Sequence, residues 1–466
     1  MKTLFAIILL VLVAASAQAA TYQPTWESLD ARQTPQWFDD AKFGIFIHWG
    51  VYSVPAWGPK GSYAEWYWHY MNDPKHPTAK YHKDTYGEKF TYQDFAPMFK
   101  AELFNPDQWA DVFAKSGAKY VVLTSKHHEG FALWPSAQSW NWNSVDIGPH
   151  RDLCGDLTKS VKAKGLRMGF YYSLYEWYNP NYHADLKGYV DNHMIPQIKD
   201  LVTRYQPSLV WTDGEWEHPS EDWKSVEFLA WLFNESPVKD EVAVDDRWGK
   251  DTRGKHGGFY TTEYGHGGEN QELLKQHKWE ECRGIGASFG YNRNEDAQDY
   301  KSATELIHLL IDTVSRGGNL LLDIGPTADG RIPVIMQQRL LEIGDWLKVN
   351  GEAIYGTHPW RVASEGDVRY TAAGSAVPGS AGVPTGTSGK AGEDTRAPGV
   401  YAIALKWPGK ELVLSVPKPT QVTMLGVAQP LKWRHKDGKL DISIPPLSVD
   451  EVPCRHAYVF KLTGVK

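Results

Sequence analysis

The fold of this chain is decided by the stretch Ser208-Leu209-Val210-Trp211-Thr212-Asp213-Gly214-Glu215-Trp216. Its apolar β-formers, Leu209, Val210 and Trp211, predict a short buried strand that ends at an acidic residue and a glycine. Parallel strands of α/β barrels deliver polar side chains in this way to their carboxyl ends, where active sites form. We therefore expect Asp213 to lie at the mouth of such a barrel.

Further apolar runs on both sides of this strand alternate with helical patterns along the chain. Strands are predicted at 43–48, 120–124, 167–172, 242–246 and 259–263, near 286–289, and at 319–324. Helices are predicted at 105–116, 157–164, 188–205, 223–234, 303–314 and 336–349. Repeated βα units of this length predict an α/β fold, a (β/α)8-type barrel over 21–356.

The pattern changes after about Gly356. Short β-rich runs at 401–405, 412–416 and 456–460 are separated by turn residues and lack helical periodicity. They predict a C-terminal antiparallel β-sandwich domain over 357–466. A Gly/Ala/Ser/Thr/Pro-rich insert at 371–398 has too few large apolar residues to pack, so we expect a loop there.

The first twenty residues have the pattern of a secretory signal peptide. A basic start with Lys2 precedes an apolar run from Leu4 to Ala15, and Ala17-Gln18-Ala19 is a small-x-small cleavage site. The run is too short for a membrane anchor, and no other long apolar run follows it. We expect cleavage near Ala19 or Ala20 and an exported mature chain, periplasmic or secreted, with no membrane span.

Composition narrows the classes of partner and site. The chain has 49 Lys and Arg against 56 Asp and Glu, which does not favour a nucleic-acid partner. Three widely spaced cysteines, Cys154, Cys282 and Cys454, allow at most one disulfide and have no zinc-finger spacing. The 21 Trp and 24 Tyr, many of them after predicted strands, favour a carbohydrate site over core filling alone, because such rings pack on sugars.

Polar residues gather at the predicted strand ends. They are His48, His127, His128, Tyr171, Trp211, Asp213, Asp246, Arg247 and Glu263. Imidazoles, a guanidinium, carboxyls and aromatic rings suit a neutral polyol, which needs hydrogen bonds for its hydroxyl groups and cover for its apolar faces.

Metal and cofactor sites are weaker alternatives. The three histidines with Asp213 form a possible zinc site, but adjacent strand residues point to opposite faces, so His127 and His128 would not easily chelate together. The chain has no His-Glu-x-x-His, and the glycine-rich stretch 284–290 misses the dinucleotide fingerprint by one residue. No Gly-x-Ser-x-Gly elbow occurs either. We expect neither a metal nor a cofactor.

Glycoside cleavage needs two carboxyl groups, one ionised and one protonated. Asp213 is the better-defined ionised candidate because of its place at a strand end. Glu263 is the acid candidate at another strand end, and its rivals are Glu65, Glu280 and Glu281. Burial against aromatic rings would raise the pKa of the one that acts as the acid.

A series of motifs resembles the α-L-fucosidases of glycoside hydrolase family 29. The series consists of Phe43-Gly44-Ile45-Phe46-Ile47-His48-Trp49-Gly50, Lys126-His127-His128-Glu129-Gly130-Phe131, Gly169-Phe170-Tyr171-Tyr172-Ser173, Trp211-Thr212-Asp213-Gly214, Asp246-Arg247-Trp248-Gly249, Gly286-Ala287-Ser288-Phe289-Gly290-Tyr291-Asn292 and Gly317-Gly318-Asn319-Leu320-Leu321-Leu322. The motifs run in family order over roughly 25–360, and together they are highly specific.

The resemblance implies an exo-acting retaining α-L-fucosidase that releases terminal fucosyl residues from an oligosaccharide or glycoconjugate. Asp213 matches the family nucleophile. Glu263 matches the acid/base of bacterial members, whose motifs this chain follows most closely, with Glu280 as the alternative. The residues that match the fucose-binding set are His48, Trp57, Glu65, His127, His128, Tyr171, Trp211, Arg247 and Phe289. A fucose-binding protein without turnover and a hydrolase of a related sugar, such as an α-L-galactoside, are the alternatives.

Overall fold

The computed structural model describes residues 21–265, 274, 276–374 and 399–465. The predicted signal peptide at 1–20 therefore lies outside the described residues, and so does the predicted insert from residue 375 on. Within the described ranges, no helix is long and apolar enough to cross a membrane.

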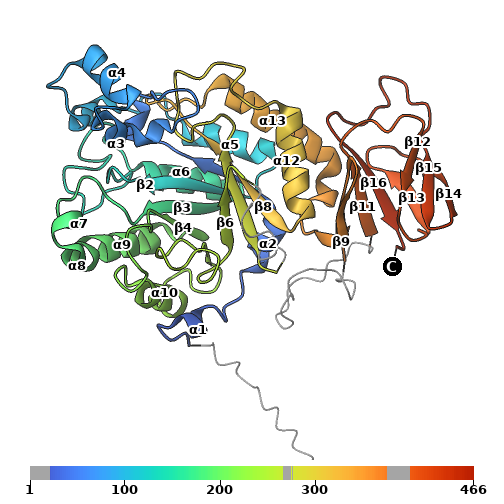
Figure 1. The fold of residues 1–466 in the computed structure, drawn as a ribbon, viewed down its shortest axis with the longest axis horizontal. Helices are drawn as coiled ribbons and strands as arrows, with labels where there is room; N and C mark the ends of the chain where they lie inside the picture. The colour runs from blue at the N-terminus through green and yellow to red at the C-terminus, as the bar shows by residue number, and fades with distance from the viewer. Residues whose placement is uncertain (1–20, 266–273, 275, 375–398, 466) are drawn as a thin grey trace, which may run out of the picture.

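A sheet of eight parallel strands forms the centre of the molecule (Figure 1). Its strands are β1 Phe43–Ile47, β2 Tyr120–Lys126, β3 Arg167–Ser173, β4 Leu209–Asp213, β5 Ala243–Val244, β6 Tyr260–Glu263, β7 Trp279–Gly284 and β8 Gly318–Ile324. Their order, β5-β4-β3-β2-β1-β8-β7-β6, is the cyclic order of a (β/α)8 barrel opened between β5 and β6. The predicted α/β barrel fold is confirmed.

The two open edges of this sheet meet through the backbone. Gly258 N donates to Asp245 O at 2.8 Å, and Phe259 N donates to Val244 O at 3.0 Å. A Cβ built on Gly258 would lie 1.8 Å from Val244 O, so only glycine allows this approach. The strands thus curl far enough for their carboxyl ends to surround one site.

Six of the described helices lie outside the strands of this sheet (Figure 1). They are α5 Pro106–Ser116, α6 Leu153–Ala163, α9 Ile195–Tyr205, α10 Ser225–Asn234, α12 Ala303–Ser315 and α13 Val334–Asn350. Each overlaps a predicted helix. Local signals set their ends: Ser302 and Glu305 form a capping box on α12, and α5 begins after Asn105 and ends at the left-handed Gly117.

The other α-helices of the described ranges lie in the loops. They are α1 Trp26–Leu29, α2 Gln36–Ala41, α3 Tyr67–Met71, α4 Pro77–Tyr86, α7 Asn181–Ala184 and α8 Leu186–Tyr189. The single helix predicted at 188–205 contains a π-helical turn, Val190–Met194, between α8 and α9. Pro196 follows that turn and has no amide hydrogen for a regular helical bond, which favours the irregularity.

Two predicted strands are wrong in detail. The seventh strand is Trp279–Gly284 and not 286–289, which is a loop. Its consecutive Glu280 and Glu281 interrupt any apolar run, and hydrogen bonds from Tyr120, Trp211 and Thr262 allow them to be buried. The fifth strand is only Ala243–Val244, because the side chains that follow it are used to build a loop.

The C-terminal part is an antiparallel sandwich of two sheets. Its strands are β9 His358–Glu365, β10 Val368–Ala373, β11 Gly399–Ala404, β12 Glu411–Leu414, β13 Gln421–Met424, β14 Lys432–Lys436, β15 Lys439–Ser443 and β16 Tyr458–Thr463. The sheet orders are β13-β16-β11-β10-β9 and β12-β15-β14. The predicted insert starts too early at 371, because 371–373 belong to β10 and pair with β11.

The sandwich packs on the last two helices of the barrel. Trp346 Nε1 in α13 donates to Ala457 O at 2.9 Å, and Arg369 Nε bonds Asp312 in α12 at 2.5 Å. The three cysteines, in contrast, contribute no cross-link, because all three are free thiols.

We predict that Gly258→Ala lowers the free energy of unfolding by about 1–3 kcal/mol, because the added methyl group separates the edges of the sheet. Urea denaturation measures this. Gly58→Ala is the matched control, since a Cβ there meets no atom closer than 3.5 Å. Equal stability of the two variants would contradict the role of Gly258 in closing the sheet.

Candidate active site

A cavity of about 450 Å³, including its open mouth, lies among the carboxyl ends of the strands. It is lined by Phe46, His48, Tyr63, Glu65, Trp66, His127, His128, Tyr171, Trp211, Asp213, Trp216, Arg247, Glu263, Cys282 and Phe289. The structure therefore brings together Asp213, Glu263 and all of the predicted sugar-binding residues except Trp57.

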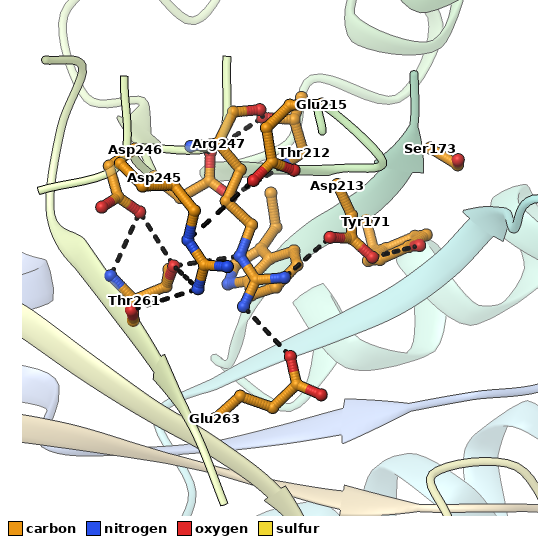
Figure 2. A network of polar contacts seen from close by, with 12 residues as sticks. Tyr171, Ser173, Thr212, Asp213, Glu215, Asp245, Asp246, Arg247, Thr261 and Glu263 are labelled. Carbon is orange, nitrogen blue, oxygen red and sulfur yellow. Dashed lines mark hydrogen bonds and ion pairs between the residues drawn. The ribbon is translucent and has the colours of Figure 1, made fainter. Parts of the chain in front are cut away.

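Asp213, the last residue of β4, has both carboxyl oxygens held by donors (Figure 2). Arg247 Nη1 donates to Oδ1 at 2.7 Å, and Tyr171 OH donates to Oδ2 at 2.9 Å. Burial opposes ionisation of this carboxyl, but the charge and hydrogen bond of Arg247, with help from Tyr171, lower its pKa below the ordinary value. Asp213 is therefore a carboxylate at neutral pH, as a nucleophile must be.

Arg247 also contacts the second carboxyl group of the cavity (Figure 2). Its Nη2 lies 3.3 Å from Glu263 Oε2, and Tyr63 OH donates to Glu263 Oε1 at 3.0 Å. The guanidinium carbon stacks 4.4 Å from the ring centroid of Trp211. One buried cation thus joins Asp213 and Glu263, so both carboxyls face the same cavity.

The loop after β5 positions this arginine. Asp245 accepts hydrogen bonds from the backbone N and the hydroxyl of Thr212, both at 2.9 Å. Asp246 accepts from the backbone N and the hydroxyl of Thr261 at 3.1 and 2.8 Å. The two aspartates tie the loop to β4 and β6 (Figure 2). Asp246, which the sequence places among the polar strand ends, is therefore part of the wall behind the cavity.

The histidines lie closer together than strand geometry predicted. His127 and His128 both line the cavity, with ring centroids 4.1 Å apart. Their expected opposite orientation is wrong because β2 ends at Lys126 and the chain turns, with Gly130 N donating to His127 O. Burial, reinforced by neighbouring positive charges, puts the pKa of both rings, and that of His48, well below the ordinary value. The cavity thus contains neutral imidazoles.

The tautomer of His128 follows from its partner. Ser173 donates its hydroxyl hydrogen to Tyr175 O at 2.6 Å, so its oxygen accepts the hydrogen on His128 Nδ1 at 2.7 Å. Nε2 of the neutral ring is then an acceptor, and it lies 3.8 Å from Asp213 Oδ2, another acceptor. A ligand hydroxyl group between them would satisfy both atoms.

Glu65 and Phe289 approach the cavity from two loops. Glu65, in the short turn Ala64–Trp66, is buried and accepts hydrogen bonds from Gly290 N at 2.8 Å and from Ser288 Oγ at 3.3 Å. Burial raises its pKa to about 7 despite these bonds. Phe289 stacks on His48 with ring centroids 4.8 Å apart, which gives the cavity an apolar side.

Besides Asp246, three candidates lie outside the cavity lining. Glu280 is buried beneath Trp211, where it accepts from Trp211 Nε1 at 3.1 Å and from Tyr120 OH. Glu281 is on the other face of β7, bonded to Thr262. Trp57 stacks instead on Tyr81, with ring centroids 4.2 Å apart.

Sequence reasoning missed five of the lining residues. They are Phe46, Tyr63, Trp66, Trp216 and Cys282. Two signals were present: alternation along β1 puts Phe46 on the same face as His48, and Tyr63 and Trp66 flank Glu65. Cys282 required the register of β6 and β7, in which it stands opposite Glu263.

Within the described ranges, no group of three or more His, Cys, Asp or Glu side chains is placed to hold a metal ion. His48 Nδ1 is instead paired with Asp323 Oδ1 at 2.7 Å.

Comparison with known proteins decides the family. The model of the family described as alpha-L-fucosidase matches residues 9–352, and that of the alpha-L-fucosidase C-terminal domain matches 391–463. The rat tissue alpha-L-fucosidase is 47% identical, with 98% of this chain and 97% of the relative covered. The chain belongs to the α-L-fucosidase family.

Other α-L-fucosidases agree in sequence and fold. The human tissue enzyme is 47% identical, with 96% of this chain and 92% of the relative covered. A Thermotoga maritima α-fucosidase, solved with a mechanism-based inhibitor, is 37% identical with a TM-score of 0.78, covering 95% of this chain and all of that one. Overall identity is thus higher to these two mammalian enzymes than to this bacterial one, whereas the expected closeness to bacterial members concerns the motifs and stays a prediction.

We predict that Glu280→Gln changes how stability depends on pH. Burial raises the pKa of Glu280 from 4.5 to about 7, so the folded state keeps a proton that the unfolded state loses. The wild type should therefore lose roughly 3 kcal/mol relative to the variant as pH rises from about 4.5 to 7. Urea denaturation at pH 5 and pH 8 measures the difference, and a pH-independent difference would contradict the assignment.

Proposed function

We propose that this α-L-fucosidase releases terminal α-L-fucosyl residues with retention, with Asp213 as the nucleophile and Glu263 as the acid/base. The observation that carries the proposal is the contact of Arg247 with both carboxyl groups in one cavity. Asp213 is ionised, and Glu263 is the more open of the two, with 30% of its side chain exposed against 12% for Asp213. A nucleophile inside and a proton donor toward the mouth suit an exo-acting hydrolase.

In the first step, Asp213 attacks the anomeric carbon while Glu263 gives its proton to the leaving oxygen. Arg247 and Tyr171 hold the attacking carboxylate in place, so little reorganisation is needed. In the second step, Glu263 takes a proton from water, which attacks the same carbon from the side the leaving group occupied. Two inversions give net retention.

The remaining lining residues suit the sugar. Neutral imidazoles suit the hydroxyl groups of a sugar, and the Nε2 of His128 accepts from one of them. Fucose lacks a 6-hydroxyl group, and the apolar side of the cavity at Phe46 and Phe289 suits its methyl group. The substrate class is a fucosylated oligosaccharide or glycoconjugate.

We predict that Asp213→Ala lowers kcat on p-nitrophenyl α-L-fucoside at least about a thousandfold, because the covalent step is lost. Azide distinguishes the two carboxyls. In Glu263→Ala it should speed breakdown of the intermediate and give the α-azide, whereas in Asp213→Ala it attacks from the opposite face and gives the β-azide.

Glu280→Ala is the control for this experiment. Because Glu280 lies beneath Trp211 and outside the cavity lining, azide should not accelerate that variant. Rescue of Glu280→Ala alone, or full turnover by Asp213→Ala, would overturn the assignment of the two carboxyls.

We also propose that the protein is exported, from the pattern of residues 1–20. Mass spectrometry of the protein purified from its native host should find a mature chain that begins at Ala20 or Thr21. An intact Met1 on the mature protein would contradict export by a cleaved signal peptide.

A further inference from the structure

Asp323 is an acidic residue at the end of an apolar run. It follows Leu320, Leu321 and Leu322 in β8, and alternation puts it on the same face as Leu321, which packs with Phe46 and Trp211 inside the barrel. The Asp323 side chain is completely buried. Burial of a carboxyl group costs free energy unless partners compensate it, so a specific contact must account for an acid at this position.

Asp323 contacts the ring of His48 with one of its two oxygens. His48 Nδ1 lies 2.7 Å from Asp323 Oδ1, whereas Asp323 Oδ2 has no hydrogen-bond partner among the described residues. Strand pairing holds the two residues in place, since β1 and β8 are in register and His48 N donates to Ile324 O at 3.1 Å. Phe46 and Phe289 pack on the imidazole with ring centroids 4.7 and 4.8 Å away. Nδ1 is thus occupied, and Nε2 is the ring nitrogen left for a ligand in the cavity.

The surroundings of this pair favour a protonated carboxyl group. Burial raises the pKa of Asp323 well above the ordinary value, and the carboxyl of Glu65 acts in the same direction. Burial lowers the pKa of His48 well below the ordinary value, with His127 acting in the same direction and Asp213 against it. The titratable groups that face the pair from other elements are Tyr52, Glu65, His127, Asp213 and Tyr264. These are acids, phenols and a neutral imidazole, so none of them supplies a positive charge to stabilise an Asp323 carboxylate.

The proton of the pair decides which role Nε2 of His48 has. With that proton present, either Asp323 donates its hydrogen to Nδ1 of a neutral ring, or an Asp323 carboxylate accepts from an imidazolium. In both forms Nε2 carries a hydrogen and is a donor. Without that proton, the carboxylate accepts the hydrogen on Nδ1, and Nε2 becomes an acceptor, as Nε2 of His128 is.

From this geometry we infer that Asp323 is a positioning residue of the active site, which holds the ring of His48 and fixes its Nε2 as a donor to a hydroxyl oxygen of the fucosyl residue. The inference rests on the function proposed above. Asp323 does not line the cavity, so it acts through His48. A sugar hydroxyl group both donates and accepts hydrogen bonds, so His48 as a donor and His128 as an acceptor recognise its two capacities.

Nitrogen NMR of the wild type with isotope-labelled histidine measures the tautomer directly. The signals of His48 are those absent from the spectrum of His48→Gln. At pH 7 we expect a hydrogen on Nε2 of His48, and an Nε2 without a hydrogen would overturn the inference. This readout does not depend on turnover. If the wild type neither binds fucose nor cleaves a fucoside, the proposed function fails, whereas the tautomer is still measured.

Two substitutions separate positioning from a purely structural role. Asp323→Leu removes the partner of Nδ1, so inhibition by free fucose should weaken about tenfold. The free energy of unfolding should not fall, because a buried oxygen without a partner is removed at the same time. Asp323→Asn keeps a donor to Nδ1 through its amide group, so inhibition by fucose should stay within about threefold of the wild type.

Asn319→Leu is the matched control. Asn319 is buried on the same face of β8, but its Nδ2 donates to Phe38 O at 2.7 Å and it does not line the cavity. The substitution should lower the free energy of unfolding and leave inhibition by fucose within about twofold. Unchanged inhibition in Asp323→Leu, or a loss in Asp323→Asn as large as that in Asp323→Leu, would overturn the role of Asp323.

Discussion

The active site depends on one buried cation, Arg247, held between two carboxyl groups. Its guanidinium is almost inaccessible to solvent, and transfer of such a charge from water is costly unless it is paired and fully hydrogen-bonded. Asp213, Glu263 and the hydroxyl of Thr261 meet that need. The ion pair stabilises both charges. The contact with Arg247 keeps Asp213 ionised, although burial alone would raise the pKa of this carboxyl.

The position of this cation explains the irregular part of the barrel. The described residues between β5 and β6 form a loop held by Asp245 and Asp246, where a regular unit has a helix. The backbone bonds of Gly258 and Phe259 then close the sheet. In this loop, buried polar contacts replace regular strand pairing. They fix the guanidinium of Arg247 over the ring of Trp211.

Much of this arrangement is predictable from local pattern. Leu209, Val210 and Trp211 are buried on both faces of a parallel sheet, so an apolar run predicts β4 and places Asp213 at its end. Local pattern does not predict β7, because Glu280 and Glu281 are acidic residues whose burial depends on partners from other strands. Those contacts are between residues far apart in the chain, and no local pattern contains them.

The same limit applies to the cavity. His127 and His128 share one side because β2 ends before them, and periodicity cannot locate that end. In the sequence, Trp57 stands beside a glycine and Trp66 beside a glutamate, and neither neighbour shows which ring reaches the cavity. In the fold, Trp57 packs on Tyr81, whereas Trp66 lines the cavity. Composition predicts that aromatic rings meet the sugar, but loop conformation selects which of them do.

The electrostatics of the cavity match the chemistry of its proposed ligand. Burial leaves the three imidazoles neutral and raises the pKa of Glu65 to about 7, while the charge of Asp213 is balanced by Arg247. A sugar carries no charge, so a site whose fixed charges cancel binds it without an uncompensated ion. As pH rises above 7, ionisation of Glu65 adds a negative charge near Glu263 and Asp213. An ionised Glu65 can only accept hydrogen bonds, so the hydrogen bond that a protonated Glu65 would give to a ligand is lost.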